Sequence, residues 1–306
     1  MNIPQLVYFL SAAQHGSFSA AAKSLHLAQP SLSEQIRRLE GELGVPLFVR
    51  VGRGVTLTEA GKTLVPHAQS VLASVEAARE AVAGVRDVRA GVATFGTFST
   101  AVYYLLADLA EDFAERYPGV RVRLTGLNSA AVAEDVRTGR LEAGLVVLPV
   151  DDEGLHVRPV MRDEVLYLSA HEHRLRRPIR ITDLAERPIV LSDASHVNSD
   201  PSRRLFTERA QAAGVTIQPL IEVEHLSTAL ELAARGIVDT IAPSTVARSR
   251  RFPAGLKGMR FADRIYDTFA FITRRGGVVS PATQALMSLA EARLGDLQRE
   301  IDEREP

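Results

Sequence analysis

The segment AAAKSLHLAQPSLSEQIRRLE, residues 20–40, most constrains the fold, because it holds two helical patterns separated by barely one turn. Pro30 fits the first turn of the second helix, where its missing N–H would have no partner. That helix has a repeating apolar stripe, whose members are three or four positions apart: Leu32, Ile36, Leu39 and Leu43. Its opposite face is polar. The pattern predicts a helix-turn-helix, whose second helix can enter a DNA major groove.

Helix-ending and helix-starting residues precede this segment. Gly16 suits the left-handed end of a first helix, and Ser17 suits the start of a short second one. Periodicity alone leaves a second interpretation open, a three-helix bundle whose polar face meets only solvent.

The stretch that follows, PLFVRVGRGVTLTEAGKTL, favours the DNA-binding interpretation. It places Gly52-Arg53-Gly54 between two strand-like segments, which predicts a hairpin with an arginine at its tip. Arg53 could lie against phosphates or in the narrow minor groove, where the negative potential is strongest. Arg50, on the incoming strand, is a second candidate for contact with phosphates. Basic side chains outnumber acidic ones six to four in residues 1–62, a mild excess that decides nothing alone.

Residues 18–61 resemble the DNA-binding domain of LysR-type transcriptional regulators, on the Gln29-Pro30 pair, Ser33, Pro46-Leu47-Phe48 and the run from Thr56 to Gly61. Ala28 departs from the family, which often has a Ser or Thr helix cap there. The resemblance and the polar face together predict a DNA-binding domain over residues 1–58. The predicted contacts are Gln29, Pro30, Ser31, Ser33, Glu34, Arg37, Arg38, Arg50 and Arg53. Arg37 and Glu34 are expected to read bases, because arginine pairs with guanine and a carboxylate accepts from cytosine.

A linker helix is expected over residues 59–88, beginning after Thr58, with a bend near Pro66. Its apolar positions keep a 3.5-residue period for three heptads: Leu64, Ala68, Val71, Val75, Ala78, Val82 and Val85. This period favours a seam between helices of two subunits, although a helix packed on its own domain stays possible. The resemblance implies a homodimer, with dimers commonly pairing into tetramers.

Beyond residue 89 strand and helix patterns alternate, which predicts an α/β fold with parallel strands covered on both faces. Expected strands lie near 92–95, 120–125, 143–147, 165–168, 189–191, 217–223 and 238–241, with helices near 101–117, 130–138, 202–213 and 227–234. We predict two Rossmann-like subdomains of the type 2 periplasmic-binding-protein kind, one over 92–160 plus 268–300 and one over 161–267. Crossings near 159–162 and 264–268 would leave a cleft between them.

Two strand-to-helix turns are expected to line that cleft. Ser99 and Thr100 lie in one, and Asn128 and Ser129 in the other. Free N–H groups at a helix start suit an anion such as a carboxylate, although plain helix capping explains the same residues. The segment FAERYPGVRVRLTGLNSAAVAEDVRTGRLEAGLV resembles the effector domain of the same family, and this resemblance implies that both turns contact a small-molecule effector. The helix starts predict that this effector is an anion such as a carboxylate.

The second subdomain departs from the family on its side of the cleft. His196 and His225 are further predicted effector contacts, with a pH-sensitive contact between histidine and an anion as a hypothesis. The Asp239-Thr240 pair replaces the glycine and apolar residue usual in the family. Whether His225 and Asp239 contact the ligand stays open from the sequence.

Several other classes of chemistry find little support. With 306 residues the chain should form two or three folding units, and its net charge of -1 is not that of a polycation. It contains no cysteine, which excludes disulfides, a thiol nucleophile and thiolate metal ligands. His171 and His173 lack a third metal ligand nearby in sequence. Without a nucleophile elbow, a P-loop or a dinucleotide fingerprint, neither an enzyme nor a cofactor is expected.

Two expectations concern the ends of the chain. The first residues lack the basic start of a signal peptide and keep helical spacing, which favours a cytoplasmic protein without a membrane span. Ser280, Thr283 and the acidic tail are expected to form solvated surface.

The leading hypothesis from these patterns is a ligand-responsive regulator that binds an inverted-repeat DNA operator. The alternative is a small-molecule binding protein whose N-terminal helices serve only assembly.

Overall fold

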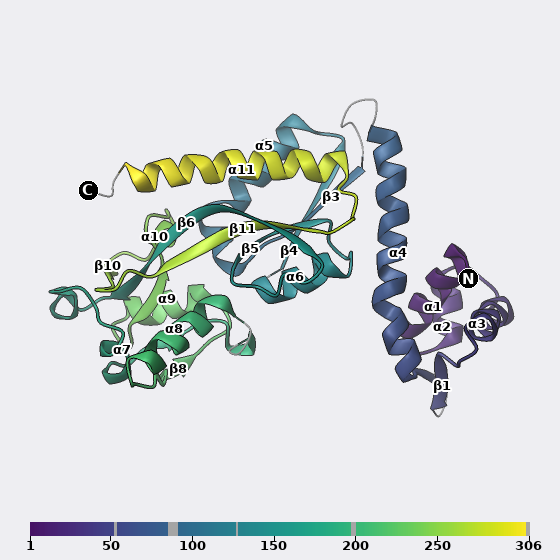
Figure 1. Ribbon diagram of the computed structural model, residues 1–306, viewed down its shortest axis with the longest axis horizontal. Helices are drawn as coiled ribbons and strands as arrows, with labels where there is room; N and C mark the ends of the chain where they lie inside the picture. The colour runs from purple at the N-terminus through teal and green to yellow at the C-terminus, as the bar shows by residue number, and fades with distance from the viewer. Residues whose placement is uncertain (52–53, 85–90, 127, 197–199, 304–306) are drawn as a thin grey trace. The chain divides into compact units, whose positions relative to one another are not determined.

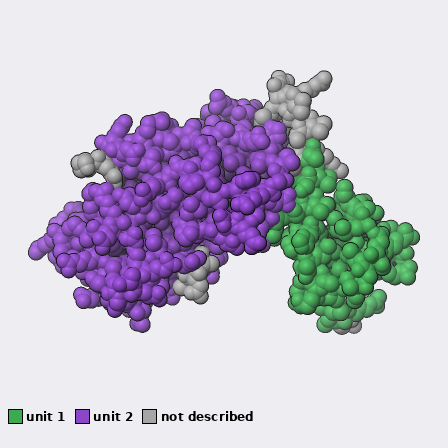
Figure 2. All heavy atoms as spheres, in the orientation of Figure 1, with its two compact units in different colours: residues 1–80, 138–140 green, residues 81–137, 141–306 purple. Residues whose placement is uncertain are grey.

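The computed structural model describes residues 1–306 apart from 52–53, 85–90, 127, 197–199 and 304–306 (Figure 1). The chain divides into two compact units, which Figure 2 shows in different colours. The first comprises residues 1–80 with 138–140, and the second residues 81–137 with 141–306. No helix among the described residues is both long and apolar enough to cross a membrane.

The first unit contains the predicted helix-turn-helix and hairpin. Its elements are α1 (Ile3–His15), α2 (Phe18–Ser24), α3 (Gln29–Leu43), β1 (Phe48–Val51), β2 (Gly54–Leu57) and α4 (Glu59–Gly84). Gly16 ends α1 in the left-handed conformation, with φ of 59°. The Ser17 hydroxyl accepts a hydrogen bond from the Ala20 N–H at the start of α2. Both predicted caps are therefore confirmed.

The apolar stripe of α3 builds the core of the first unit. Leu32, Ile36 and Leu39 are buried against residues of α1 and α2, as their spacing predicts. The prediction is wrong for Leu43, which is 40% exposed, because α3 ends at this residue. The Phe48 ring lies 5.5 Å from that of Phe9, which joins the hairpin to the same core.

The hairpin is held against the end of α1. Strands β1 and β2 pair antiparallel, with Phe48 opposite Leu57. The Val55 N–H donates to the Gly16 carbonyl over 2.8 Å. A Cβ atom on Gly54 would lie only 2.7 Å from that carbonyl oxygen, so the close approach requires glycine. The body of the hairpin is therefore fixed to the helical core.

Helix α4 begins as predicted, because the Thr58 hydroxyl accepts from the Gly61 N–H over 3.0 Å. Ala68 is buried in the core of the first unit and Leu64 packs against it, so this part of the predicted seam serves the domain itself. Val71 is 41% exposed and remains available for a partner helix. The side chains of Val82 and Val85 lie outside the described residues.

The second unit contains a mixed sheet of seven strands. They are β3 (Gly91–Gly96), β4 (Val120–Thr125), β5 (Ala143–Leu148), β6 (Leu155–Ser169), β9 (Thr240–Pro243), β10 (Lys257–Arg260) and β11 (Tyr266–Arg274). Their order is β10-β6-β11-β5-β3-β4, and β9 also pairs with β6. A separate pair joins β7 (Val190–Leu191) to β8 (Ile221–Glu222) in parallel.

The expectation of parallel strands is correct only in part. Strand β3 pairs in parallel with β4 and β5, whereas β11 runs antiparallel to β5 and β6, and β9 and β10 run antiparallel to β6. The reason is that β6 and β11 are long strands that pass through both halves of the unit. The predicted strand at 165–168 is only the end of β6, and the crossings predicted near 159–162 and 264–268 lie in this pair or directly before it.

Helices cover the sheet and complete the second unit. Its remaining elements are η1 (Ser99–Tyr103), α5 (Leu106–Arg116), α6 (Ser129–Arg137), η2 (Glu172–Leu175), α7 (Asp183–Glu186), η3 (Ala194–His196), α8 (Pro201–Ala212), α9 (Leu226–Ala234), α10 (Ser244–Ala247) and α11 (Pro281–Asp302). Helices α5 and α11 share a core with Phe95 and Phe271, while α6 packs on another core with Val146 and Ile272. Figure 1 shows α6 on the side of the sheet opposite α11.

Two local predictions in this unit are wrong. The helix expected over 101–117 is a short 3₁₀ helix, η1, followed by α5. Ser280 and Thr283 are fully buried and not solvated. The Ser280 hydroxyl caps α11 and donates to Glu142 over 2.7 Å, and the Thr283 hydroxyl accepts from the Thr94 N–H in β3. Both polar side chains therefore form hydrogen bonds where α11 meets the sheet.

Candidate nucleic-acid interface and ligand cavity

The outer face of α3 carries most of the predicted DNA contacts. Its exposed members are Gln29, Pro30, Ser31, Arg37 and Arg38, while Ser33 and Glu34 are half-buried. The Gln29 amide donates to the Ser33 hydroxyl over 2.7 Å, which orders the first turn. Ala28 leaves this helix start without a side-chain cap. The polar face is therefore continuous and accessible.

Glu34 organises the two arginines of this face. Its carboxylate accepts from Arg37 over 3.0 Å and from Arg38 over 3.1 Å, one oxygen for each guanidinium. These bonds, that of Arg38 first, lower the pKa of Glu34 below its ordinary value. The side chains of Arg37 and Arg38 stay largely exposed, at 78% and 63%. The ionised Glu34 carboxylate thus holds the guanidinium groups of Arg37 and Arg38 toward solvent.

A residue outside the predicted set, Glu40, connects α3 to the hairpin. Its carboxylate accepts the N–H groups of Leu47 over 2.7 Å and Phe48 over 3.2 Å. The sequence carried no signal for this contact, because no periodicity specifies the proximity of Glu40 to the hairpin. Arg50 is exposed on β1. Arg53 lies outside the described residues, so its contact with DNA stays a prediction.

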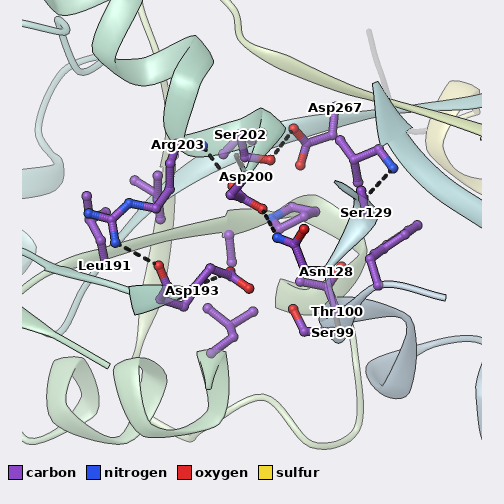
Figure 3. A pocket seen from close by; sticks show the side chains of 18 of the residues that line it. Ser99, Thr100, Asn128, Ser129, Leu191, Asp193, Asp200, Ser202, Arg203 and Asp267 are labelled. Carbon is purple, nitrogen blue, oxygen red and sulfur yellow. Dashed lines mark hydrogen bonds between the residues drawn. The ribbon is translucent and has the colours of Figure 1, made fainter. Parts of the chain in front are cut away.

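A cavity of about 70 Å³ lies in the second unit (Figure 3). Ser99 and Thr100 at η1 line it, together with Asn128 and Ser129 at α6, so all four predicted residues converge. The further lining comes from the other half of the unit and includes Leu191, Ser192, Asp193, Asp200, Ser202, Arg203, Phe206, Leu226 and Ile241. Apolar walls with a few polar groups are typical of a small-molecule site.

Two of the predicted residues have structural partners as well. The Asn128 carbonyl oxygen accepts from the Ala130 N–H over 2.8 Å, and its amide donates to Asp200 over 3.3 Å. The Ser129 hydroxyl accepts from the Val147 N–H over 2.9 Å. Helix capping, the plainer interpretation, is therefore correct for Asn128. The first-turn N–H groups of α6 that Asn128 caps are not available to an anion.

Three carboxylates that sequence reasoning missed line the cavity. Asp200 caps α8, accepting from the Arg203 N–H over 2.9 Å, and its burial raises its pKa. Burial, with repulsion from Asp200, raises the pKa of Asp193 to about 6. Burial raises the pKa of Asp267 to about 7, aided by Asp163 and Asp200. Only the Asp200-Pro201 pair carried a signal, as a helix start.

The histidines predicted as effector contacts lie outside the lining of the cavity. The Nδ1 atom of His196 lies 3.8 Å from a Glu224 carboxylate oxygen. His225 is exposed where α9 begins. Asp239 is fully buried, bonded to the Tyr167 hydroxyl and, over 2.6 Å, to Arg174. The unusual Asp239 of the sequence is therefore part of a core ion pair.

The other histidine pair has no ligand cluster around it. His171 precedes η2 and lies 5.5 Å from His173 between ring centroids, with its Nε2 atom 3.0 Å from the Gly236 carbonyl. Within the part of the chain that the structure describes, no three potential ligands gather around a metal position.

The two units define a class of protein: a DNA-binding regulator in which a winged helix-turn-helix precedes an α/β ligand-binding domain. Residues 3–62 match the model of the bacterial regulatory helix-turn-helix protein, lysR family, and residues 86–295 match that of the LysR substrate binding domain. The second match covers more than half of the chain. The chain belongs to the LysR family of transcriptional regulators.

Similar proteins agree with this assignment. The HTH-type transcriptional regulator IlvR of Caulobacter vibrioides is 28% identical over 87% of this chain and 88% of its own length. The nitrogen assimilation regulatory protein nac of Klebsiella aerogenes is 32% identical over 81% of this chain and 80% of its own length. A full-length OxyR variant from Pseudomonas aeruginosa shares the fold with a TM-score of 0.69 and 23% identity, over 96% of this chain and 94% of that chain. CbnR complexed with its target DNA has a TM-score of 0.66 and 23% identity, over 96% and 100%.

Proposed function

We propose that this regulator binds an inverted-repeat operator as a dimer or tetramer, through α3 and the hairpin, and responds to a small-molecule effector in the cavity of the second unit. It acts by binding and not by catalysis, in the cytoplasm, where operator DNA lies. The observation that carries this proposal is the exposed arginine pair on the outer face of α3, held by Glu34.

The arrangement of α3 supports different roles for the predicted contacts, some with bases and some with phosphates. Arg37 has the most exposed side chain of the three charged residues on this face, at 78%. We assign base reading to Arg37 and Glu34, and contact with phosphates to Arg50 and Arg53. Gln29, Pro30, Ser31, Ser33 and Arg38 complete the proposed surface. Phosphate contacts position a protein, while base contacts specify sequence.

The free face of α4 supports the proposed dimer. Val71 and Ala78 are exposed, while Ala68 is used in the core of the first unit. Two copies of a seam with a 3.5-residue period bury such positions against each other. A dimer presents two recognition helices, and this matches a DNA site of two related halves.

A gel-shift titration on DNA from upstream of the protein's own gene tests the proposal, with a shuffled sequence of the same length as control. We expect a sequence-selective shift, and a Val71→Asp variant should require a higher protein concentration for it. Analytical ultracentrifugation of both proteins reports whether the variant has lost its dimer. Equal binding of the two DNA sequences, or an unchanged dimer in the variant, would contradict the corresponding part.

A further inference from the structure

The side chains that line the cavity of the second unit include several acidic groups and few basic ones. Asp193, Asp200 and Asp267 line it, and Arg203 is the one basic side chain among its described lining residues. Figure 3 shows Asp193, Asp200 and Asp267 around one space. The Arg203 guanidinium donates to the Ser192 carbonyl over 3.0 Å and pairs with Glu222. Its hydrogen bonds are therefore made outside the set of three carboxylates, although its positive charge acts on Asp200.

Asp267 is the most buried of the three carboxylates. It is 4% exposed, and one of its oxygens accepts from the Ser202 hydroxyl over 3.0 Å. The described residues supply no donor to its second oxygen. Its neighbour across the β6–β11 ladder is Asp163, another fully buried carboxylate, which accepts from Ser244 over 2.6 Å. A buried carboxylate normally has several donors or a cation beside it, so Asp267 lacks a positive partner.

An anionic ligand would fit this surrounding poorly. The first-turn N–H groups of α6 already donate to Asn128, and the Arg203 N–H at the start of α8 donates to Asp200. A carboxylate would add a negative charge to three existing ones, and like charges at close range repel strongly at low dielectric. An alkylammonium group offers three donors and one positive charge.

We infer that the cavity binds a small ligand that carries a protonated amine, with Asp267 and Asp200 as its acceptors. This inference rests on the proposed function, because it names the chemical class of the effector. The cavity volume of about 70 Å³ favours small molecules as the first ligands to test.

Three small probes that differ mainly in charge test the inference on the full chain by titration calorimetry: 2-aminoethanol, 1,2-ethanediol and glycolate. We expect 2-aminoethanol to bind about tenfold or more tightly than the neutral diol, because its ammonium gains at least one charged hydrogen bond. Glycolate should give no binding heat. If glycolate binds as tightly as 2-aminoethanol, or if none of the three binds, the inference is overturned.

The sign of the pH dependence is a second test. Burial raises the pKa of Asp267 to about 7, with Asp163 and Asp200 facing it as acids and Tyr104 nearby. Arg203 and His196 are the basic groups that act on Asp200. Affinity for 2-aminoethanol should therefore rise about tenfold between about pH 6 and about pH 8, while an alkylammonium stays protonated throughout. A protonated Asp267 that donated to an anion would give the opposite slope and contradict the inference.

Two substitutions and one control locate the binding. Asp267→Asn and Asp200→Asn each remove one negative charge, and Asn caps a helix as well as Asp does, so the second variant keeps the start of α8. Both should lose about tenfold or more in affinity for 2-aminoethanol. Asp263→Asn changes the same charge at an exposed position outside the cavity lining and should bind as the parent does. Unchanged affinity in both cavity variants overturns the inference, and Asp200→Asn suffices if Asp267→Asn fails to fold.

The same protein preparations are tested by gel shift, which separates the two proposals. Sequence-selective DNA binding without binding of 2-aminoethanol would overturn only the amine ligand. Binding of 2-aminoethanol without any selective DNA shift would overturn the proposed operator instead.

Discussion

Glu34 and Asp267 carry the same functional group in opposite surroundings. Glu34 lies on the outer face of α3 with one arginine on each oxygen, and these bonds lower its pKa. Asp267 is buried with one hydroxyl donor and faces two further aspartates, and its pKa rises to about 7. The comparison shows that neighbouring groups decide whether a carboxylate is paired with cations, as Glu34 is, or has no cation beside it, as in the case of Asp267.

Asp267→Asn should have the largest effect on stability. Protonated Asp267 carries no buried charge, so the folded state bears no penalty near pH 4. Between about pH 4 and about pH 7 the unfolded chain has lost this proton while folded Asp267 still holds it, so stability falls with pH, and above about 7 the folded chain buries a negative charge. A pKa raised from 3.8 to about 7 corresponds to about 4 kcal/mol. Urea denaturation should therefore find the variant more stable than the parent near pH 8 by up to this amount, with little difference near pH 4.

The exposed Asp263→Asn variant is the control, because it removes a charge outside the cavity lining. Its stability should match that of the parent at both pH values. A gain near pH 8 as large as that of Asp267→Asn would show that the overall charge matters and not the burial of Asp267.

Arg37→Ala tests the other member of the comparison. If Arg37 reads a base, its loss should reduce the ratio of cognate to random DNA affinity about 10- to 100-fold, equal to about 1–3 kcal/mol. Arg38→Ala removes the second partner of Glu34 and should lower both affinities by similar factors. Fluorescence anisotropy on the two DNA sequences measures the ratio. Equal losses on cognate and random DNA for Arg37→Ala would overturn its assignment as a base reader.

Glu34→Gln should have the smallest effect and the opposite sign on random DNA. It removes a negative charge from the DNA-facing surface and releases both guanidinium groups for phosphates, so affinity for random DNA should rise a few-fold. The slope of affinity against salt should become steeper by about one. Glu59→Gln, which frees Lys62 on α4, is the matched control. A weaker random complex for Glu34→Gln would show that Glu34 itself supplies attraction.

Local patterns predicted the first unit well because its elements depend on short-range signals. The spacing of Leu32, Ile36 and Leu39 and the caps at Ser17 and Thr58 each act within a few residues. Leu43 broke the pattern only because α3 ends there. The contact of Glu40 with the turn before β1 was missed, since it joins residues whose proximity no periodicity specifies.

The second unit was harder to predict because long-range pairing decides its chemistry. The turns at Ser99 and Asn128 could be found from helix-start signals, and they do line the cavity. Asp267 could not, because its position follows from the antiparallel pairing of β6 with β11, which the alternating strands and helices did not specify. The burial of Thr283 could not be predicted either, since a sequence does not show that a hydroxyl accepts from a buried N–H.

The bond from Glu40 to the Leu47 and Phe48 N–H groups has a consequence for the design of hybrid regulators. Transplanting α3 alone into a relative would move Glu40 without the Leu47 and Phe48 N–H groups that donate to it in this chain. A graft that extends from α3 through β2 keeps acceptor and donors on the same transferred piece. A hybrid that tests the proposed role of α3 in DNA recognition should therefore transfer the helix and the hairpin together.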